Sequence, residues 1–161
     1  MTITPFNESE LAAWRNNLPA KTCAAAVICV NNNREMLAVK ASYKDRWSLP
    51  GGSVDRDEPP RTAALRELME ETQITLQPDD LQFAGVVHLA PNSGMRDSLY
   101  FLFIARGVSD QPQPDGHEIL EAKWMNPEEF KEVAGGRPHA LLAADIVSET
   151  ATVGTYLEAT L

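Results

Sequence analysis

Three glutamates on one face of a predicted helix constrain this sequence more than any other feature. Apolar residues recur at helical spacing between residues 59 and 72, and two prolines suit the first turn of a helix there. Glu67, Glu70 and Glu71 stand at positions i, i+3 and i+4 of this helix, so their side chains share one face. Because like charges at this spacing destabilise an isolated helix by about 0.2–0.5 kcal/mol per pair, the pattern favours a bound cation.

A glycine turn stands shortly before the helix. Pro50-Gly51-Gly52 is expected to break any regular element, and it offers a close backbone and a free carbonyl beside the acidic face. Clustered oxygen ligands suit hard cations such as Mg²⁺, Mn²⁺ or Ca²⁺, and Mg²⁺ commonly shares its remaining positions with substrate phosphates. The alternative is an ordinary solvated helix face, which three glutamates alone do not exclude.

The charge balance limits the partners of the chain. Its 161 residues carry 23 acidic and 14 basic side chains, a formal net charge of −9. A negative field of this size repels polyanions, so DNA and RNA polymers are not expected partners. A small phosphorylated ligand would be admitted if bound cations reversed the charge locally, and such cations would also polarise a phosphoryl oxygen and acidify a bound water.

The pattern along the chain predicts one α+β domain. Two-residue alternation or short apolar runs predict strands at 23–30, 36–41, 81–90, 98–108 and 119–125. Further helices are expected at 11–17, capped by Asn7 or Ser9, at 127–134, capped by Asn126, and through most of the tail from residue 138, with breaks near Ser148 and Gly154. Hairpin-like links favour a mixed sheet over a doubly wound parallel one. No stretch has the length of a membrane span or the pattern of a secretion signal, so we expect a cytoplasmic protein.

The cysteines and histidines lack the spacing of a metal or redox site. Cys23 and Cys29 lie six residues apart in an apolar run, and we expect both to be buried, reduced thiols. His88, His117 and His139 are scattered, and each is expected to be structural or to lie at the surface.

The complete spacing around the helix resembles the Nudix box. The pattern runs from Gly52 through five residues to Glu58, then through seven residues to Arg66-Glu67-Leu68-Met69-Glu70-Glu71-Thr72-Gln73-Ile74. Every defined position of the box matches except one, where Gln73 replaces glycine. The Trp-Ser-Leu-Pro-Gly-Gly segment before the box and the Pro-Glu-Glu-Phe after a tryptophan strand are also typical of the family, so that residues 22–134 fit.

This resemblance implies a fold and a set of site residues. The fold is an α/β/α sandwich around a mixed sheet, with residues 1–21 as an N-terminal extension and 137–161 as a helical C-terminal tail. Glu67, Glu70 and Glu71 resemble the family's metal-binding carboxylates, and the carbonyl of Gly51 resembles a further ligand. Glu67 is the first candidate for the general base, Glu70 shares the catalytic role, and Arg66 would orient a catalytic glutamate.

Other residues have less certain roles within the same resemblance. Glu118 matches a further metal-binding carboxylate, with Glu121 as the alternative. Glu58 would pair with Arg66, hold a metal through water, or simply fix the loop on the helix. Gly52, Arg46 and Glu58 are the candidates for substrate binding.

The resemblance also implies an activity. We expect Mg²⁺-dependent hydrolysis, with Mn²⁺ as a substitute, of a diphosphate linkage in a nucleoside diphosphate-X or nucleoside triphosphate such as ADP-ribose, a nucleotide sugar or a (d)NTP. The alternative is a non-catalytic Nudix module that binds a nucleotide as a sensor. Partners are small nucleotides, with neither a nucleic acid polymer nor a membrane, and a homodimer is one candidate assembly. Glutamine in the left-handed conformation would be strained by about 1 kcal/mol, so we expect the helix to end differently at Gln73.

Overall fold

A seven-stranded sheet forms the centre of the protein in the computed structural model, which describes residues 7–91 and 96–160. The strands are β1 (Thr22–Val30), β2 (Met36–Ala41), β3 (Gly51–Ser53), β4 (Gln82–Ala90), β5 (Ser98–Arg106), β6 (Ile119–Met125) and β7 (Thr155–Thr160). The helices are α1 (Glu8–Asn16), α2 (Pro60–Thr72), α3 (Pro127–Val133) and α4 (Pro138–Val147), with a 3-10 turn, η1 (Pro78–Asp80).

The sheet is mixed, as the sequence predicts. Its order is β6-β2-β1-β5-β4-β7, and β3 pairs with β1 beside this path. The β1–β5 and β4–β7 pairs are parallel, whereas β1–β2, β2–β6, β1–β3 and β4–β5 are antiparallel. The expected α+β class is therefore confirmed.

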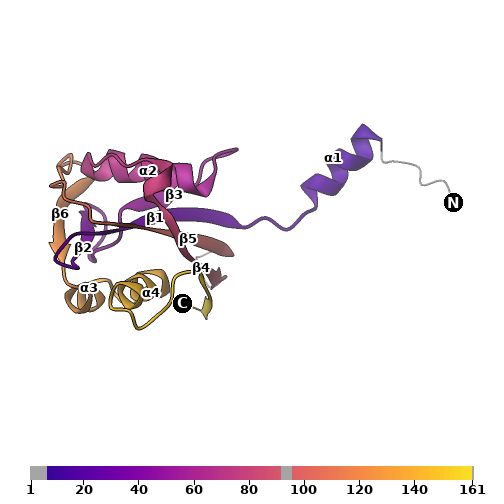
Figure 1. Cartoon of the computed structure of the whole chain (residues 1–161). Coiled ribbons are helices and arrows are strands. Elements are labelled where there is room, and N and C mark those ends of the chain that lie inside the picture. The colour runs from indigo at the N-terminus through magenta and orange to yellow at the C-terminus, as the bar shows by residue number, and fades with distance from the viewer. Residues whose placement is uncertain (1–6, 92–95, 161) are drawn as a thin grey trace.

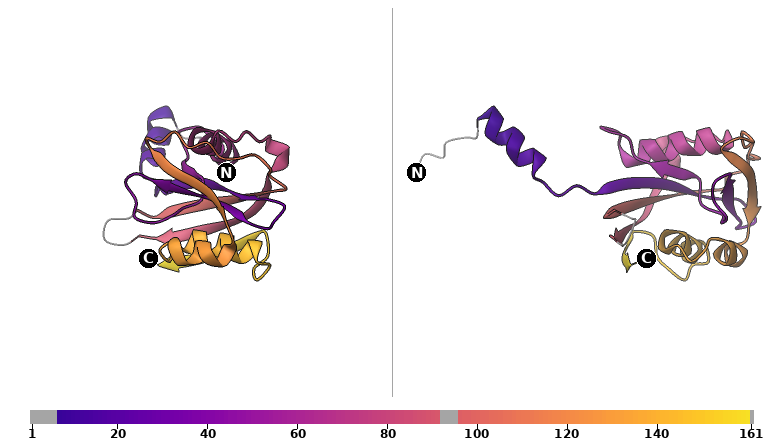
Figure 2. Two further views of the ribbon diagram at one scale, coloured as in Figure 1. Left: turned by 90° about the vertical axis from the view of Figure 1, so that its left-hand side faces the viewer. Right: turned by 180° about the vertical axis from the view of Figure 1, so that it is seen from behind.

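Helices cover both faces of the sheet (Figures 1 and 2). Helix α2 lies on one face, where Leu68 joins an apolar cluster with Val27 and Cys29 of β1. Helices α3 and α4 lie on the other face, where Phe130 and Ile146 join a second cluster. Strand β1 is therefore covered on both sides, which explains why its sequence is continuously apolar instead of alternating.

The chain ends in a strand, contrary to the expected helical tail over 137–161. Helix α4 stops at Val147, and residues Thr155–Thr160 pair with β4 in parallel at the edge of the sheet. Gly85 of β4 allows the two strands to approach closely, because a Cβ there would lie 2.6 Å from the backbone oxygen of Thr155. The short tail sequence carries no strand signal strong enough to reveal a partner this distant in the chain.

Two shorter elements also differ from expectation. Residues Gly51–Ser53, where no regular element was expected, form β3 through pairing with β1. Helix α1 is capped by Asn7 in a capping box and buries no residue. It lies apart from the sheet (Figures 1 and 2), within the predicted extension over 1–21, of which residues 1–6 lie outside the described part.

Helix α2 ends in the ordinary way despite its glutamine. Gln73 adopts the left-handed conformation, with φ 60° and ψ 11°, and its backbone N–H donates to the carbonyl of Met69. Its side-chain Nε2 donates to the same oxygen at 3.3 Å. The expectation of a different helix end is therefore wrong, because glutamine accepts the conformation that glycine usually supplies.

The cysteines differ from one another. Cys29 is buried, and burial raises the pKa of its thiol to about 12, as expected for an inert cysteine. Cys23 is only partly buried, so the expectation of burial is wrong for this residue. Among the described residues, no helix combines the length and apolar character that crossing a membrane requires.

Candidate active site

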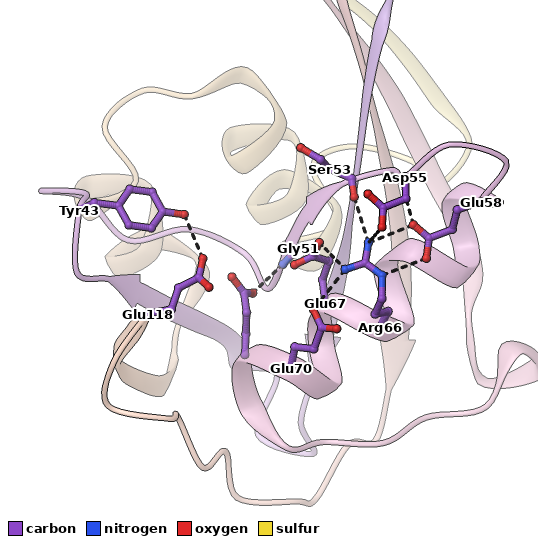
Figure 3. Close-up of polar contacts among 10 residues, drawn as sticks. Tyr43, Gly51, Ser53, Asp55, Glu58, Arg66, Glu67, Glu70 and Glu118 are labelled. Carbon is purple, nitrogen blue, oxygen red and sulfur yellow. Dashed lines mark hydrogen bonds and ion pairs between the residues drawn. The ribbon is translucent and has the colours of Figure 1, made fainter.

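The guanidinium of Arg66 organises the acidic face of α2 (Figure 3). Its Nε and Nη2 donate to the two carboxylate oxygens of Glu58, each at 3.0 Å. Its Nη1 donates to Glu67 at 2.8 Å and to Glu70 at 3.1 Å. These charge-assisted contacts raise the pKa of Arg66 above its ordinary value, mainly through Glu58. One fixed cation therefore positions three carboxylates.

Glu58 acts on the loop as well as on Arg66. Its Oε2 accepts the backbone N–H of Asp55 at 3.0 Å, and the hydrogen bond from Arg66 is the main reason that its pKa is lowered. Arg66 also donates to the backbone oxygen of Ser53 at 3.1 Å. This arrangement favours two of the three expected roles of Glu58, pairing with Arg66 and fixing the loop.

Gly52 leaves the space that the carboxylate of Glu67 occupies. A Cβ at Gly52 would lie 2.6 Å from the Cδ of Glu67, which is closer than side chains approach one another. The Glu67 side chain is only 17% exposed, since it lies between Gly52 and Arg66. Gly52 thus acts on Glu67 through its lack of a side chain.

Glu71 is the most perturbed acid of the face. Its Oε2 accepts the backbone N–H of Gly51 at 2.8 Å. Burial is the main cause that raises its pKa to about 8, and the charges of Glu67 and Glu118 add to the effect. Burial deprives the charged form of this carboxylate of solvation, so a nearby positive charge would stabilise that form.

Glu118 comes from the loop before β6 and lies beside Tyr43, near the glutamates of α2 (Figure 3). Its Oε1 accepts a hydrogen bond from the hydroxyl of Tyr43 at 3.4 Å. The pKa of Tyr43 is raised by burial first and then by the negative charges of Glu118 and Glu71. Of the two candidates, Glu118 therefore lies near the glutamates of α2, and no such contact is seen for Glu121 among the described residues.

A pocket of about 430 Å³ adjoins the acidic face at Gly51. Arg46, which the sequence marks for substrate binding, lines it together with Lys44 and Arg137. Tyr100 and His139 line it as well, as stacked rings. The sequence did not reveal these two aromatic residues as a pair, because β5 and α4 are far apart in the chain and no local motif predicts their contact.

The donor set fits a hard cation, although the side chains are not closed around one. In the described part of the chain, no group of three or more histidine, cysteine, aspartate or glutamate side chains is gathered so that it could hold a metal ion. Glu67 and Glu70 bond to Arg66, and Glu70 is 52% exposed. Glu71 and Glu118, by contrast, form no ion pair within the described residues. Carboxylate oxygens with unbalanced negative charge are the ligands that Mg²⁺ and Mn²⁺ prefer.

Comparison with known proteins places this geometry in a family. Residues 21–144 match the NUDIX domain. A putative 8-oxo-dGTP diphosphatase of Bacillus subtilis (strain 168) is 35% identical over 106 residues, which cover 66% of this chain and 67% of that protein. Nudix hydrolase 8 of Arabidopsis thaliana is 32% identical over 111 residues, which cover 64% of this chain and only 29% of that protein.

Solved structures share the fold. A NUDIX hydrolase from Nitrosomonas europaea superimposes with a TM-score of 0.72 at 18% identity, over 90% of this chain and 82% of that one. A C. elegans Ap4A hydrolase, solved as a binary complex, superimposes with a TM-score of 0.63 at 25% identity, over 80% of this chain and 97% of that one. The domain match, the two relatives and the shared sandwich together establish that the chain belongs to the Nudix family, as a Nudix pyrophosphohydrolase.

Proposed function

We propose that the chain hydrolyses a diphosphate linkage in a nucleoside diphosphate-X or nucleoside triphosphate, with Mg²⁺ or Mn²⁺ bound at the acidic face. The observation that carries this proposal is the half-buried Glu71, whose carboxylate is bonded to the Gly51 N–H and has a pKa raised to about 8. Such an acid gains a full negative charge when a cation binds. The relatives named for 8-oxo-dGTP and Ap4A support a nucleotide as the substrate.

The residues of this chain divide the work between them. Glu67, Glu70, Glu71, Glu118 and the carbonyl of Gly51 are the candidates to hold the cations. When bound, divalent cations would neutralise the phosphate oxygens and make an attacking water more acidic. Arg66 holds Glu67 at 2.8 Å, which limits the rotamers that this carboxylate can adopt.

The bond changes follow from this placement. The oxygen of a water attacks one phosphorus, and Glu67 is our candidate to accept the proton that the water loses. The bond from that phosphorus to the bridging oxygen breaks in line, and the bridging oxygen leaves on the other phosphate. Two phosphorylated products result, with no covalent bond to the protein.

A substrate panel tests the proposal. The protein is incubated with Mg²⁺ and ADP-ribose, nucleotide sugars, (d)NTPs or oxidised dGTP, and phosphate is measured after a phosphatase is added. We expect turnover of at least one compound, a loss of at least 100-fold in Glu70→Gln and no loss in Glu121→Gln, a matched change at an exposed position on β6. Turnover that persists in Glu70→Gln would refute the residue assignment.

The same panel separates the enzyme from a sensor module. Binding of a nucleotide without turnover, at any Mg²⁺ or Mn²⁺ concentration, would favour the non-catalytic alternative. All the expected carboxylates are present, and Arg66 organises Glu58, Glu67 and Glu70, so the geometry favours the enzyme.

A further inference from the structure

The pocket beside the acidic face contains an unusual pair of rings. His139 and Tyr100 stack with their centroids 4.0 Å apart and their planes 9° apart. Tyr100 lies near the start of β5, and His139 lies in the first turn of α4. The stack thus joins a strand to a helix, and both rings line the cavity.

One ring nitrogen of His139 is buried without a hydrogen-bond partner, and the lowered pKa of the ring keeps it neutral near pH 7. Burial first, and then the positive charges of Arg137, Arg46 and Lys44, lower its pKa to about 4. Its Nδ1 is buried and has no hydrogen-bond partner. A buried nitrogen left unpaired costs free energy, and a water, an ion or a ligand can supply the partner that such a group lacks.

The pocket is continuous with the acidic face. Gly51 lines the pocket, and its N–H binds the carboxylate of Glu71. Burial first, and then the negative charges of Glu71 and Glu67, raise the pKa of Tyr100, so the tyrosine lies within electrostatic reach of both acids. A ligand whose phosphates sit at Glu71 would therefore extend its other end past Tyr100 toward His139.

The lining indicates what that other end is. Trp47, Leu49, Leu89 and Ala140 supply apolar walls, and the hydroxyls of serine and threonine residues supply a few polar contacts. A cavity of about 430 Å³ with this lining lies in the size range of small-molecule sites. A flat ring with hydrogen-bonding edges suits it better than a sugar or a phosphate, because stacked aromatic rings favour planar partners and a neutral imidazole adds no attraction for an anion.

We infer that this pocket receives the heteroaromatic base of the nucleotide, and that His139 is the specificity-determining residue that hydrogen-bonds to the edge of the base. The inference rests on the proposed function for the identity of the ligand. Lys44 and Arg46 stand at the same pocket and are placed to balance phosphate charge.

The test measures binding without turnover. Calorimetry at pH 7.5, with no metal added, compares AMP, GMP, CMP and UMP with ribose 5-phosphate, which has the same phosphate and no base. The variants are His139→Phe, which keeps the stacking ring and removes both nitrogens, and His139→Gln, which restores hydrogen-bonding atoms.

We expect one or more of the nucleotides to bind at least 10-fold more tightly than ribose 5-phosphate. His139→Phe should reduce this preference by about 3- to 10-fold, the size of one hydrogen bond, and should leave ribose 5-phosphate within 2-fold. His139→Gln should recover part of the loss. A merely structural histidine would instead weaken all ligands together, or shift the melting temperature without changing the preference.

Two results would overturn the inference. One is that no nucleotide binds more tightly than ribose 5-phosphate, and the other is that His139→Phe leaves the preference unchanged. Because the assay needs no hydrolysis, a selective effect of His139→Phe in a protein that turns over no diphosphate would refute the proposed function and keep the binding role. Conversely, hydrolysis of a diphosphate together with an unchanged base preference in His139→Phe would support the proposed function and refute the binding role of His139.

Discussion

Replacing Gln73 by glycine should stabilise the protein slightly and leave catalysis unchanged. Gln73 holds φ at 60°, in the left-handed region that residues with a Cβ adopt at a cost. The conformation is fixed from both sides, because the backbone N–H of Gln113 donates to the carbonyl of Thr72 at 2.8 Å and Ile74 is buried in the core. The strain therefore cannot relax without moving the end of α2.

The magnitude follows from three terms. Left-handed backbone costs about 1–2 kcal/mol for a residue with a Cβ, and glycine removes this cost. Glycine is also more flexible in the unfolded chain, which stabilises the unfolded state by about 0.4–1 kcal/mol and offsets part of this gain. The 3.3 Å hydrogen bond from the glutamine Nε2 to Met69 is long and exposed, so its loss matters less than either. We expect Gln73→Gly to raise the free energy of unfolding by about 0.5 kcal/mol.

Alanine at the same position is the matched control. Gln73→Ala keeps the Cβ and the strain and loses the hydrogen bond, so it should lie about 1 kcal/mol below Gln73→Gly. Urea titration measures the difference directly, and the melting temperatures should separate by about 2–4 °C for a chain of this size. If alanine proves as stable as glycine, or if glycine lowers hydrolytic activity more than twofold, the strain argument is wrong.

Three further predictions test the packing and charge of the site. Gly52→Ala should displace the carboxylate of Glu67, only 2.6 Å from the new Cβ, and lower kcat at least 10-fold while the melting temperature stays within a few degrees, since the tip of a side chain can move. Gly85→Ala should instead cost about 1–3 kcal/mol in urea titration, because the backbone oxygen of Thr155 cannot move without loosening β7, and an unchanged stability would contradict the β4–β7 pairing. In the metal-free protein, the folded-state pKa of about 8 for Glu71 lies above the unfolded value of 4.5, so its folded form binds more protons and stability falls as pH rises between these values. Glu71→Gln should therefore become progressively more stable than wild type from pH 5 to pH 8 in EDTA, and a constant difference would show that the carboxylate is not perturbed.

Local patterns made much of the fold predictable. The bounds of β2 and β6 agree with those predicted from the sequence, and those of β1, β4, α2 and α3 differ by one residue at an end, since periodicity and caps act within a few residues. The resemblance to the family implied that Arg66 orients a glutamate, and Arg66 contacts Glu67 and Glu70 because all three belong to the same helix. Cytoplasmic location and homodimerisation stay predictions from the sequence.

Features that depend on distant partners were not predictable. Strand β7 forms because the edge of β4 is open to a parallel partner, and no pattern within residues 155–160 predicts this pairing. The stack of Tyr100 on His139 likewise requires α4 to lie across β5, and a scattered histidine carries no spacing that would reveal it. The left-handed Gln73 was missed for a different reason, since the cost of about 1 kcal/mol is small beside the packing of α2.

The charged residues of the pocket explain how a chain with a large negative net charge could bind a nucleotide. A protein with a net charge of −9 should repel a nucleotide, yet Lys44 and Arg46 line the pocket that adjoins the acidic face. Burial first, and then the charges of Arg137 and these two cations, lower the pKa of His139, so a histidine that would otherwise be partly charged near neutral pH is kept neutral. A neutral ring can offer one nitrogen as an acceptor, which an imidazolium cannot, and this distinguishes the edges of different bases. Lys44 and Arg46 would thus attract phosphate and help burial to keep the imidazole neutral, while the acidic face, which adjoins the pocket at Gly51, would receive its positive charge from the cations that we propose.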